Sequence, residues 1–284
     1  MRKTSLMSTL TLFFAIQMTM SQAPNQECMT NLSIYVEYAK VKNYDAAYEP
    51  WKMVLEACPD INRANFLYGE RILKHKISNS SGADKDAFIT DLMKLYDDSM
   101  QFFPKNYAMA DVIIDKVLFK YKEKMIQKDD IYAQLNEAFM NDRSNFSNPQ
   151  ALYMYFSSLV DLHDEGKQEI QTVFDVYDEV VAKVEAENMK LTNAIQKLLP
   201  KEEDGSITSK DKRRLKAYTT NSESYGKIAQ SIDSKLGAIA GHAADLRGGA
   251  RPARYAGPLV SGRRDTCTTA RCRQQDRTDG GSLG

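Results

Sequence analysis

Few side chains in this sequence are placed to do chemistry, and those few lie far apart. The three histidines are isolated: His75 among lysines in LKHKI, His163 in the polar turn LHDEGK, and His242 near the C-terminal end. Carboxylates surround His163, so that turn is interpreted either as a metal or acid–base site or as an ordinary solvated turn. No H-E-x-x-H, G-x-S-x-G, P-loop or G-x-G-x-x-G pattern occurs. We therefore expect no enzyme active site, no cofactor and no metal.

The charges of the chain balance only on average. Residues 1–240 hold 30 Lys and Arg against 34 Asp and Glu, a net charge of −4, whereas residues 241–284 hold 8 Arg against 4 Asp. Binding to nucleic acid depends on clustered cations that neutralise phosphates. The basic run KDKRRLK (210–216) has no interleaved aromatic residue and is typical of a solvated helix start. We therefore expect a protein or peptide partner and no nucleic acid.

Residues 1–23 have the layout of a secretory signal. Arg2 and Lys3 precede an apolar stretch at 6–20, which ends in the small-residue segment 21–23. An uncleaved membrane anchor is the alternative, although the stretch is short for a span and contains polar residues. We expect export to the periplasm or beyond, with no membrane span after cleavage.

The helical elements begin with a hairpin. Residues 30–41 place Ile34, Tyr35, Tyr38 and Val41 on one predicted apolar face. After a short polar break at 42–43, a second helix carries Pro50 near its start, where proline is tolerated, and ends before Pro59. Two helices joined by so short a break must fold back on each other.

This hairpin resembles a tetratricopeptide repeat, whose 34-residue pattern sets small and aromatic residues at fixed steps and a proline at the end. The matching residues are Tyr44, Ala47, Trp51, Val54 and Pro59. Tyr35 departs from the pattern, because it stands where glycine is usual. The narrower resemblance is to exported tetratricopeptide-like proteins of Bacteroidetes type, and an arbitrary helical hairpin is the alternative.

Further helix pairs follow the first. Gly69 lies 34 residues after Tyr35, at the close-packing place of a second unit, whose surplus length we assign to a turn-rich insertion at 77–86. Third and fourth units are expected at 106–141 and 148–184. The expected core residues are Trp51, Tyr44, Tyr38, Phe66, Tyr68, Phe102, Phe103 and Phe156.

The predicted fold is thus all-α, with hairpins stacked as a tetratricopeptide-like solenoid over 24–167. The last repeat helix and a long helical arm follow at 168–240, with a loop at 201–207 between two long helices. An irregular tail follows at 241–284. It holds 8 of the 14 glycines and no Lys, Glu, Ile or Phe, and the apolar periodicity stops at Ala240. The tail is interpreted either as disordered and anion-binding or as a frameshift or joined foreign fragment.

Export makes the cysteines candidates for a disulfide. Cys28 precedes the first helix of the hairpin and Cys58 ends the second, so we expect the two to lie side by side and to bond. Free thiols, or an unpaired Cys28, are the alternatives. Cys267 and Cys272 in the tail lack the neighbours of a zinc site.

The resemblance also implies a partner-binding face on the first helix of each unit. Its expected residues are Val36, Ala39, Lys40, Arg63, Phe66, Glu70 and Lys74. The cations among them would hold carboxylates of a partner, and ordinary exposed charge is the alternative. Three functions follow: an interaction scaffold of the bacterial envelope, a structural subunit that forms homo-oligomers through its arm, and an envelope hydrolase.

Overall fold

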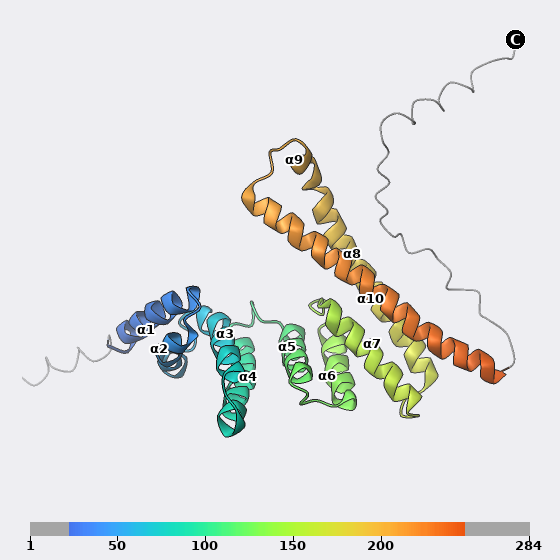
Figure 1. Ribbon diagram of the computed structural model, residues 1–284, viewed down its shortest axis with the longest axis horizontal. Coiled ribbons are helices and arrows are strands. Elements are labelled where there is room, and N and C mark those ends of the chain that lie inside the picture. The colour runs from blue at the N-terminus through green and yellow to red at the C-terminus, as the bar shows by residue number, and fades with distance from the viewer. Residues whose placement is uncertain (1–22, 248–284) are drawn as a thin grey trace, which may run out of the picture. The chain divides into compact units, whose positions relative to one another are not determined.

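The computed structural model describes the backbone of residues 23–247 and the side chains of residues 26–239. Within that range every regular element is a helix and there is no strand (Figure 1), which confirms the all-α fold class. The helices are α1 (Ala23–Lys40), α2 (Tyr44–Ala57), α3 (Ala64–Ser78), α4 (Gly82–Phe102), α5 (Met109–Lys122), α6 (Lys128–Asn141), α7 (Pro149–Asp164), α8 (Ile170–Gln196), α9 (Leu199–Glu203) and α10 (Ser209–Arg247). Nearly all of the proposed signal, the tail beyond Arg247 and the cysteines at 267 and 272 lie outside the described residues.

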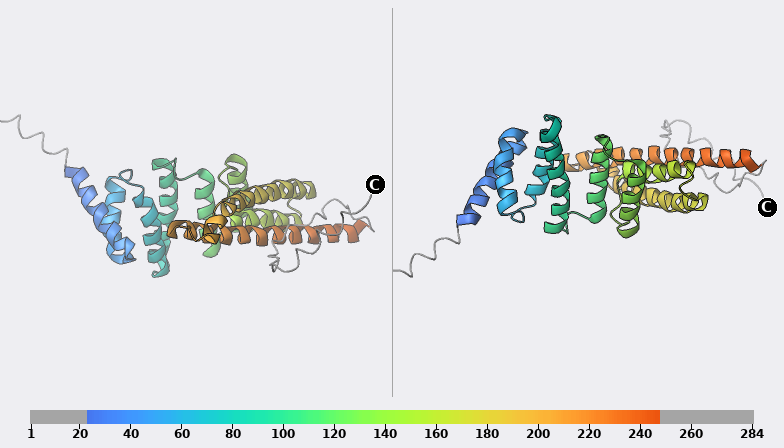
Figure 2. Two further views of the ribbon diagram at one scale, coloured as in Figure 1. Left: turned by 90° about the horizontal axis from the view of Figure 1, so that it is seen from above. Right: turned by 90° about the horizontal axis from the view of Figure 1, so that it is seen from below.

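The chain divides into two compact units, residues 1–190 and 191–284. In the first unit, α1 to α7 follow one another along a row, and each helix packs against the next (Figures 1 and 2). Helix α1 also reaches α3. The second unit contains the end of α8 together with α9 and α10. The buried side chains of α10 recur at helical spacing at Tyr225, Ile232, Leu236 and Ile239.

The α1–α2 hairpin forms as its polar break and its prolines predict. Asn43 caps α2, because its side chain accepts a hydrogen bond from the Ala46 amide at 3.3 Å. Pro50 lies inside α2 without ending it, and the helix stops at Ala57, two residues before Pro59. The backbone of Lys42 turns between the helices with a positive φ of 62°.

The apolar face predicted for α1 is wrong in three of its four residues. Tyr35 is fully buried, but Ile34, Tyr38 and Val41 are exposed, Val41 by 73%. The face that packs inward instead carries Cys28, Leu32, Tyr35 and Ala39. The buried face of α1 is rotated about the helix axis by roughly one residue position from the predicted face. Tyr38 therefore lies outside the core.

One buried asparagine joins the first three helices. The Asn65 side chain on α3 accepts a hydrogen bond from the Tyr35 hydroxyl of α1 at 2.6 Å. It donates to the carbonyl oxygens of Cys58 at 3.4 Å and Pro59 at 3.0 Å, just after α2. The Asn65 backbone carbonyl accepts from the Trp51 indole at 2.8 Å. Burial raises the pKa of Tyr35, so its hydroxyl stays a donor.

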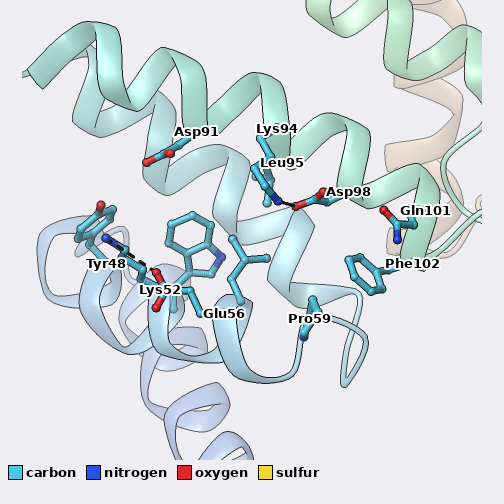
Figure 3. A pocket seen from close by; sticks show the side chains of 12 residues that line it. Tyr48, Lys52, Glu56, Pro59, Asp91, Lys94, Leu95, Asp98, Gln101 and Phe102 are labelled. Atoms are coloured by element: carbon cyan, nitrogen blue, oxygen red, sulfur yellow. Dashed lines mark hydrogen bonds and ion pairs between the residues drawn. The ribbon is translucent and has the colours of Figure 1, made fainter. Parts of the chain in front are cut away.

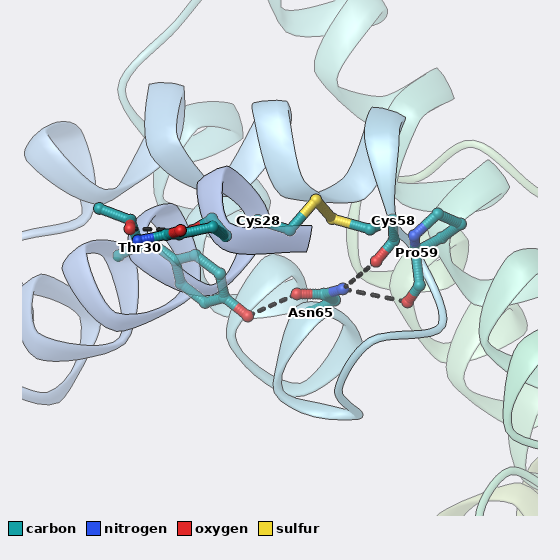
Figure 4. The surroundings of a disulfide bond; sticks show 7 residues. Cys28, Thr30, Cys58, Pro59 and Asn65 are labelled. Atoms are coloured by element: carbon teal, nitrogen blue, oxygen red, sulfur yellow. Dashed lines mark hydrogen bonds between the residues drawn. A yellow bond between two sulfur atoms is a disulfide. The ribbon is translucent and has the colours of Figure 1, made fainter. Parts of the chain in front are cut away.

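Cys28 and Cys58 form the expected disulfide, which joins the start of α1 to the end of α2 (Figure 4). Cys58 also supplies one of the carbonyls that Asn65 binds. The covalent closure and the asparagine network therefore meet at the same end of the hairpin.

Trp51 packs directly on the backbone of Gly69. A methyl group at position 69 would lie 2.6–2.7 Å from the indole ring, which is closer than carbon atoms pack. The sequence predicted this close-packing place, and the structure shows that Trp51 occupies it. The core around this contact contains further expected residues, among them Phe66, whose ring meets Phe102, Phe103 and Tyr107.

The predicted turn-rich insertion at 77–86 is mostly helical. Helix α3 runs to Ser78 and α4 begins at Gly82, so only residues 79–81 form a loop. Ile77 and Ile89 are buried on either side of this loop, whereas residues 78–84 are mostly exposed. The surplus residues lengthen the two helices of the hairpin, because Ile77 and Ile89 hold both helices against the core.

The arm also differs from its predicted limits. Helix α9 takes up part of the loop expected at 201–207, and α10 continues past Ala240 to Arg247. Thr208 caps α10 by accepting a hydrogen bond from the Asp211 amide at 3.1 Å. The residues that follow Ala240 include alanines, which favour a helix even where apolar periodicity is lost.

A Gly69→Ala substitution should lower the free energy of unfolding by about 2 kcal/mol, because the added methyl group collides with the Trp51 ring. Gly226→Ala on α10 is the matched control. No atom lies near its new methyl group, so the gain in helix propensity should stabilise it by up to about 1 kcal/mol. Urea unfolding of both variants gives the comparison. Equal effects of the two changes would contradict the Trp51–Gly69 contact.

Replacing both disulfide cysteines, as Cys28→Ser with Cys58→Ser, should lower the free energy of unfolding by about 3–4 kcal/mol. The bond closes a loop of roughly 31 residues, and its loss returns that entropy to the unfolded chain. Thermal unfolding under oxidising conditions measures the change. Cys267→Ser with Cys272→Ser is the control and should leave stability unchanged. A wild-type melting temperature in the Cys28/Cys58 variant would show that the bond contributes nothing.

Candidate functional site

In the first unit a groove lies between α2 and α4. Each helix lines it with a row of side chains that repeats every three or four residues. The lining residues are Tyr48, Trp51, Lys52, Leu55, Glu56 and Pro59 from α2 and the turn after it, and Asp91, Lys94, Leu95, Asp98, Gln101 and Phe102 from α4 (Figure 3). The groove has a volume of about 470 Å³. Each row spans twelve residues, or eleven steps along the helix, so the groove is about 16 Å long.

Apolar side chains form the floor of the groove. Trp51 and Leu95 are buried and belong to the core, while Leu55 and Phe102 are half-exposed and offer surface to a ligand. The indole cannot turn away, because its N–H group donates to the Asn65 carbonyl and its face rests on Gly69. The floor is therefore rigid and preformed.

Charges of both signs stand on the walls. Lys52 lies 4.0 Å from Glu56 on α2, and Lys94 pairs with Asp98 on α4. Asp91 adds a third carboxylate, so the walls carry one more negative charge than positive. Since the side chains of Lys52 and Lys94 are 46% and 72% exposed, their ion pairs are weak and can exchange for pairs with a ligand.

Tyr48 closes one end of the groove. Its ring meets Phe88 edge-on, with centroids 5.7 Å apart, and the Lys76 ammonium lies 5.1 Å from its centroid. Loss of hydration raises the pKa of the Tyr48 hydroxyl, which keeps it neutral and able to donate a hydrogen bond.

None of the predicted partner-binding residues lines this groove. On α1, Val36 is half-buried against the core and Ala39 is buried. The Lys40 ammonium donates to Glu37 one turn earlier at 2.7 Å. The ammonium group of Lys40 is therefore already paired within its own helix and would have to leave Glu37 to bind a partner.

The predicted residues of α3 divide between core and surface. Phe66 is only 2% exposed, so it offers no surface to a partner and belongs to the core, where it was also expected. Arg63 is exposed just before α3. Glu70 and Lys74 do come together, with the ammonium 2.6 Å from the carboxylate, which also accepts from the Tyr96 hydroxyl at 3.1 Å.

Carboxylates gather where α3 meets α5. Partial loss of hydration, together with the nearby carboxylates Glu70 and Asp111, raises the pKa of Asp115 to about 6, against the pull of Lys74. The pKa of Asp111 is raised as well, by loss of hydration and by Asp142. These carboxylates offset the positive charge of Lys74, whose role in binding a partner stays a prediction.

Two of the three histidines are described, and each has a structural partner. The His75 ring lies 3.1 Å from the Asp45 carboxylate, beside the Lys76–Asp45 ion pair, so it helps tie α3 to α2. His163 lies 2.8 Å from the Gln168 carbonyl across the turn between α7 and α8. Neither belongs to the groove.

The lining of the groove contains no histidine, cysteine or serine. Within residues 26–239, no cluster of His, Cys, Asp or Glu is placed to hold a metal ion. No helix in the described part of the chain is both long and apolar enough to span a bilayer.

Comparisons with protein-family models, with curated proteins and with solved structures gave no match to this chain. The assignment of a site therefore depends on the geometry of the groove and on its charges.

The spacing of residues in the sequence could have indicated the groove. Residues 48, 52, 55 and 59 and residues 91, 95, 98 and 102 form two matched rows with the same helical spacing. The expected binding face lay on the first helix of each unit, so these flanks of the second helices were missed. Only the packing of α4 beside α2 brings the two rows together.

Asp115→Asn should stabilise the protein above pH 6 and have its smallest effect near pH 4. A carboxyl whose pKa is raised by folding favours the folded state while protonated, and that contribution is lost as the pH rises through about 6. Thermal unfolding between pH 4 and pH 8 tests this. Asp60→Asn, at an exposed loop position, is the control. A difference between Asp115→Asn and wild type that does not change with pH would contradict the raised pKa.

Proposed function

We propose that this protein is a non-enzymatic interaction scaffold that binds a peptide segment of a partner protein in the α2–α4 groove. The observation that carries the proposal is the combination of a rigid apolar floor with exchangeable charges of both signs on the walls. Apolar side chains of a ligand would cover Leu55 and Phe102, and its charges would replace the weak ion pairs of Lys52 and Lys94.

The chemistry of the groove also limits the ligand. A polyanion such as nucleic acid is disfavoured, because three carboxylates stand against two ammonium groups. The mixed walls fit a segment that carries both acidic and basic residues beside apolar ones. A length of about 16 Å accommodates roughly three turns of helix or five residues of extended chain.

The repeat architecture and the cellular location of the protein are parts of the same proposal. We infer a tetratricopeptide-like stack of hairpins from the repeat-like residues of the first hairpin and from the row of sequential helix contacts. Export to the bacterial envelope is proposed from the signal-like residues 1–23 and is supported by the disulfide, a bond typical of oxidising compartments.

The single tryptophan of the chain provides a direct test, because Trp51 lies in the floor of the groove. Peptides selected from a random display library on the full chain should change Trp51 emission as they bind. Lys52→Glu with Lys94→Glu should weaken that binding at least tenfold, a loss of about 1.4 kcal/mol.

Two further variants locate the site. Lys210→Glu with Lys212→Glu, exposed on α10, is the matched control and should leave binding intact. Lys40→Glu with Lys74→Glu tests the face first expected from the tetratricopeptide resemblance. If that pair abolishes binding while the groove pair does not, the groove is not the site.

A further inference from the structure

The outer flank of α1 is apolar and uncovered in the described chain. Ile34, Tyr38 and Val41 follow one another at i, i+4 and i+7, and they are exposed by 39%, 41% and 73%. Single exposed apolar residues are ordinary on a protein surface, but a row along two turns of one helix is not.

A second apolar row lies on α2. Ala46, Pro50, Met53 and Ala57 share one side of the helix, and each is half-buried or exposed. The opposite side of α2 carries Tyr48, Lys52 and Leu55, which face α4 across the groove.

The two rows lie on the same side of the hairpin. On α1, Lys40 lies on the flank nearer α3, where it interacts with Tyr68, and the row from Ile34 to Val41 is on the other flank. Helices α1 and α2 are antiparallel and pack against each other. The flank of α1 that faces away from α3 and the flank of α2 that faces away from α4 therefore lie on the same side of the hairpin. We call these seven residues the outer face. The α1–α2 hairpin itself stands at one end of the row of helices (Figure 2).

A terminal hairpin with such a face is incomplete as a cap. Stacked repeats bury an apolar face at every junction, and their end units need a polar outer side to stay soluble. Here the end unit presents apolar side chains on its outer side. Its natural occupant is a further helix, packed as neighbouring hairpins pack.

The charges that border the outer face distinguish a second copy of this chain from a helix of another protein. The carboxylates Glu27, Glu37 and Glu49 border the outer face at helical spacing from its apolar residues. Glu37 is paired with Lys40, but no lysine or arginine among the described residues pairs with Glu27 or Glu49. A second copy of the chain would bring two acidic borders together, which disfavours a symmetric dimer.

We propose that the outer face binds a helix of a partner protein whose apolar stripe is flanked by lysine or arginine. The apolar stripe would cover the rows on α1 and α2, and the flanking cations would meet Glu27 and Glu49. This surface is separate from the α2–α4 groove and does not depend on the function proposed for it.

A synthetic helical peptide of about 18 residues, with a leucine stripe bordered by lysines, is the probe. Its sister peptide carries glutamate in place of lysine. Fluorescence anisotropy with the full chain should show binding of the lysine peptide, at least tenfold weaker binding of the glutamate peptide, and loss of affinity with added salt. Ile34→Glu with Val41→Glu should weaken binding of the lysine peptide at least tenfold.

Matched controls separate the outcomes. Met125→Glu with Met140→Glu, at exposed methionines elsewhere in the first unit, should bind the peptide like wild type, and so should Lys52→Glu with Lys94→Glu in the groove. Met53→Glu repeats the test from α2 if the α1 variant fails to fold by circular dichroism. Three results overturn the proposal: no binding of the lysine peptide, equal binding of both peptides, or a wild-type dimer in sedimentation that Ile34→Glu with Val41→Glu dissociates.

Discussion

The contact between the Trp51 ring and the backbone of Gly69 determines how the first two hairpins meet. A side chain at position 69 would hold α3 away from α2, because its first carbon atom would overlap the indole. With α3 this close, the indole N–H reaches the Asn65 carbonyl, and the Asn65 side chain reaches Tyr35 and the carbonyls after α2. A single small residue thus allows three helices to share one buried hydrogen-bond network.

The candidate groove depends on the same contact. Trp51 forms its floor, and α4 follows α3 through a short loop, so the spacing of α3 against α2 also places α4 beside α2. The disulfide between Cys28 and Cys58 closes the hairpin that carries one wall. Core packing, covalent closure and binding surface are therefore parts of one assembly, and a change in the core would be felt in the groove.

The two surfaces proposed to bind partners differ in their electrostatics. The groove carries carboxylates and ammonium groups together and suits a segment of mixed charge, whereas the outer face is apolar with an acidic border. The two proposed surfaces lie on opposite sides of α2, so a partner on one would leave the other open.

The sequence alone determined the class of the fold, the helix pairs and the disulfide. Helical spacing, the short polar break at 42–43 and the tolerated place of Pro50 act within a few residues, so they can be read without knowing the neighbours. It also singled out Gly69 as a place of close packing. Tertiary structure decided which flank of each helix is buried: Tyr38 is exposed and Tyr35 buried, although both are apolar and lie on adjacent turns. It made the stretch 77–86 helical, and it joined the rows of α2 and α4 into a groove. Those outcomes depend on which helix packs against which, and local pattern holds no information on that choice.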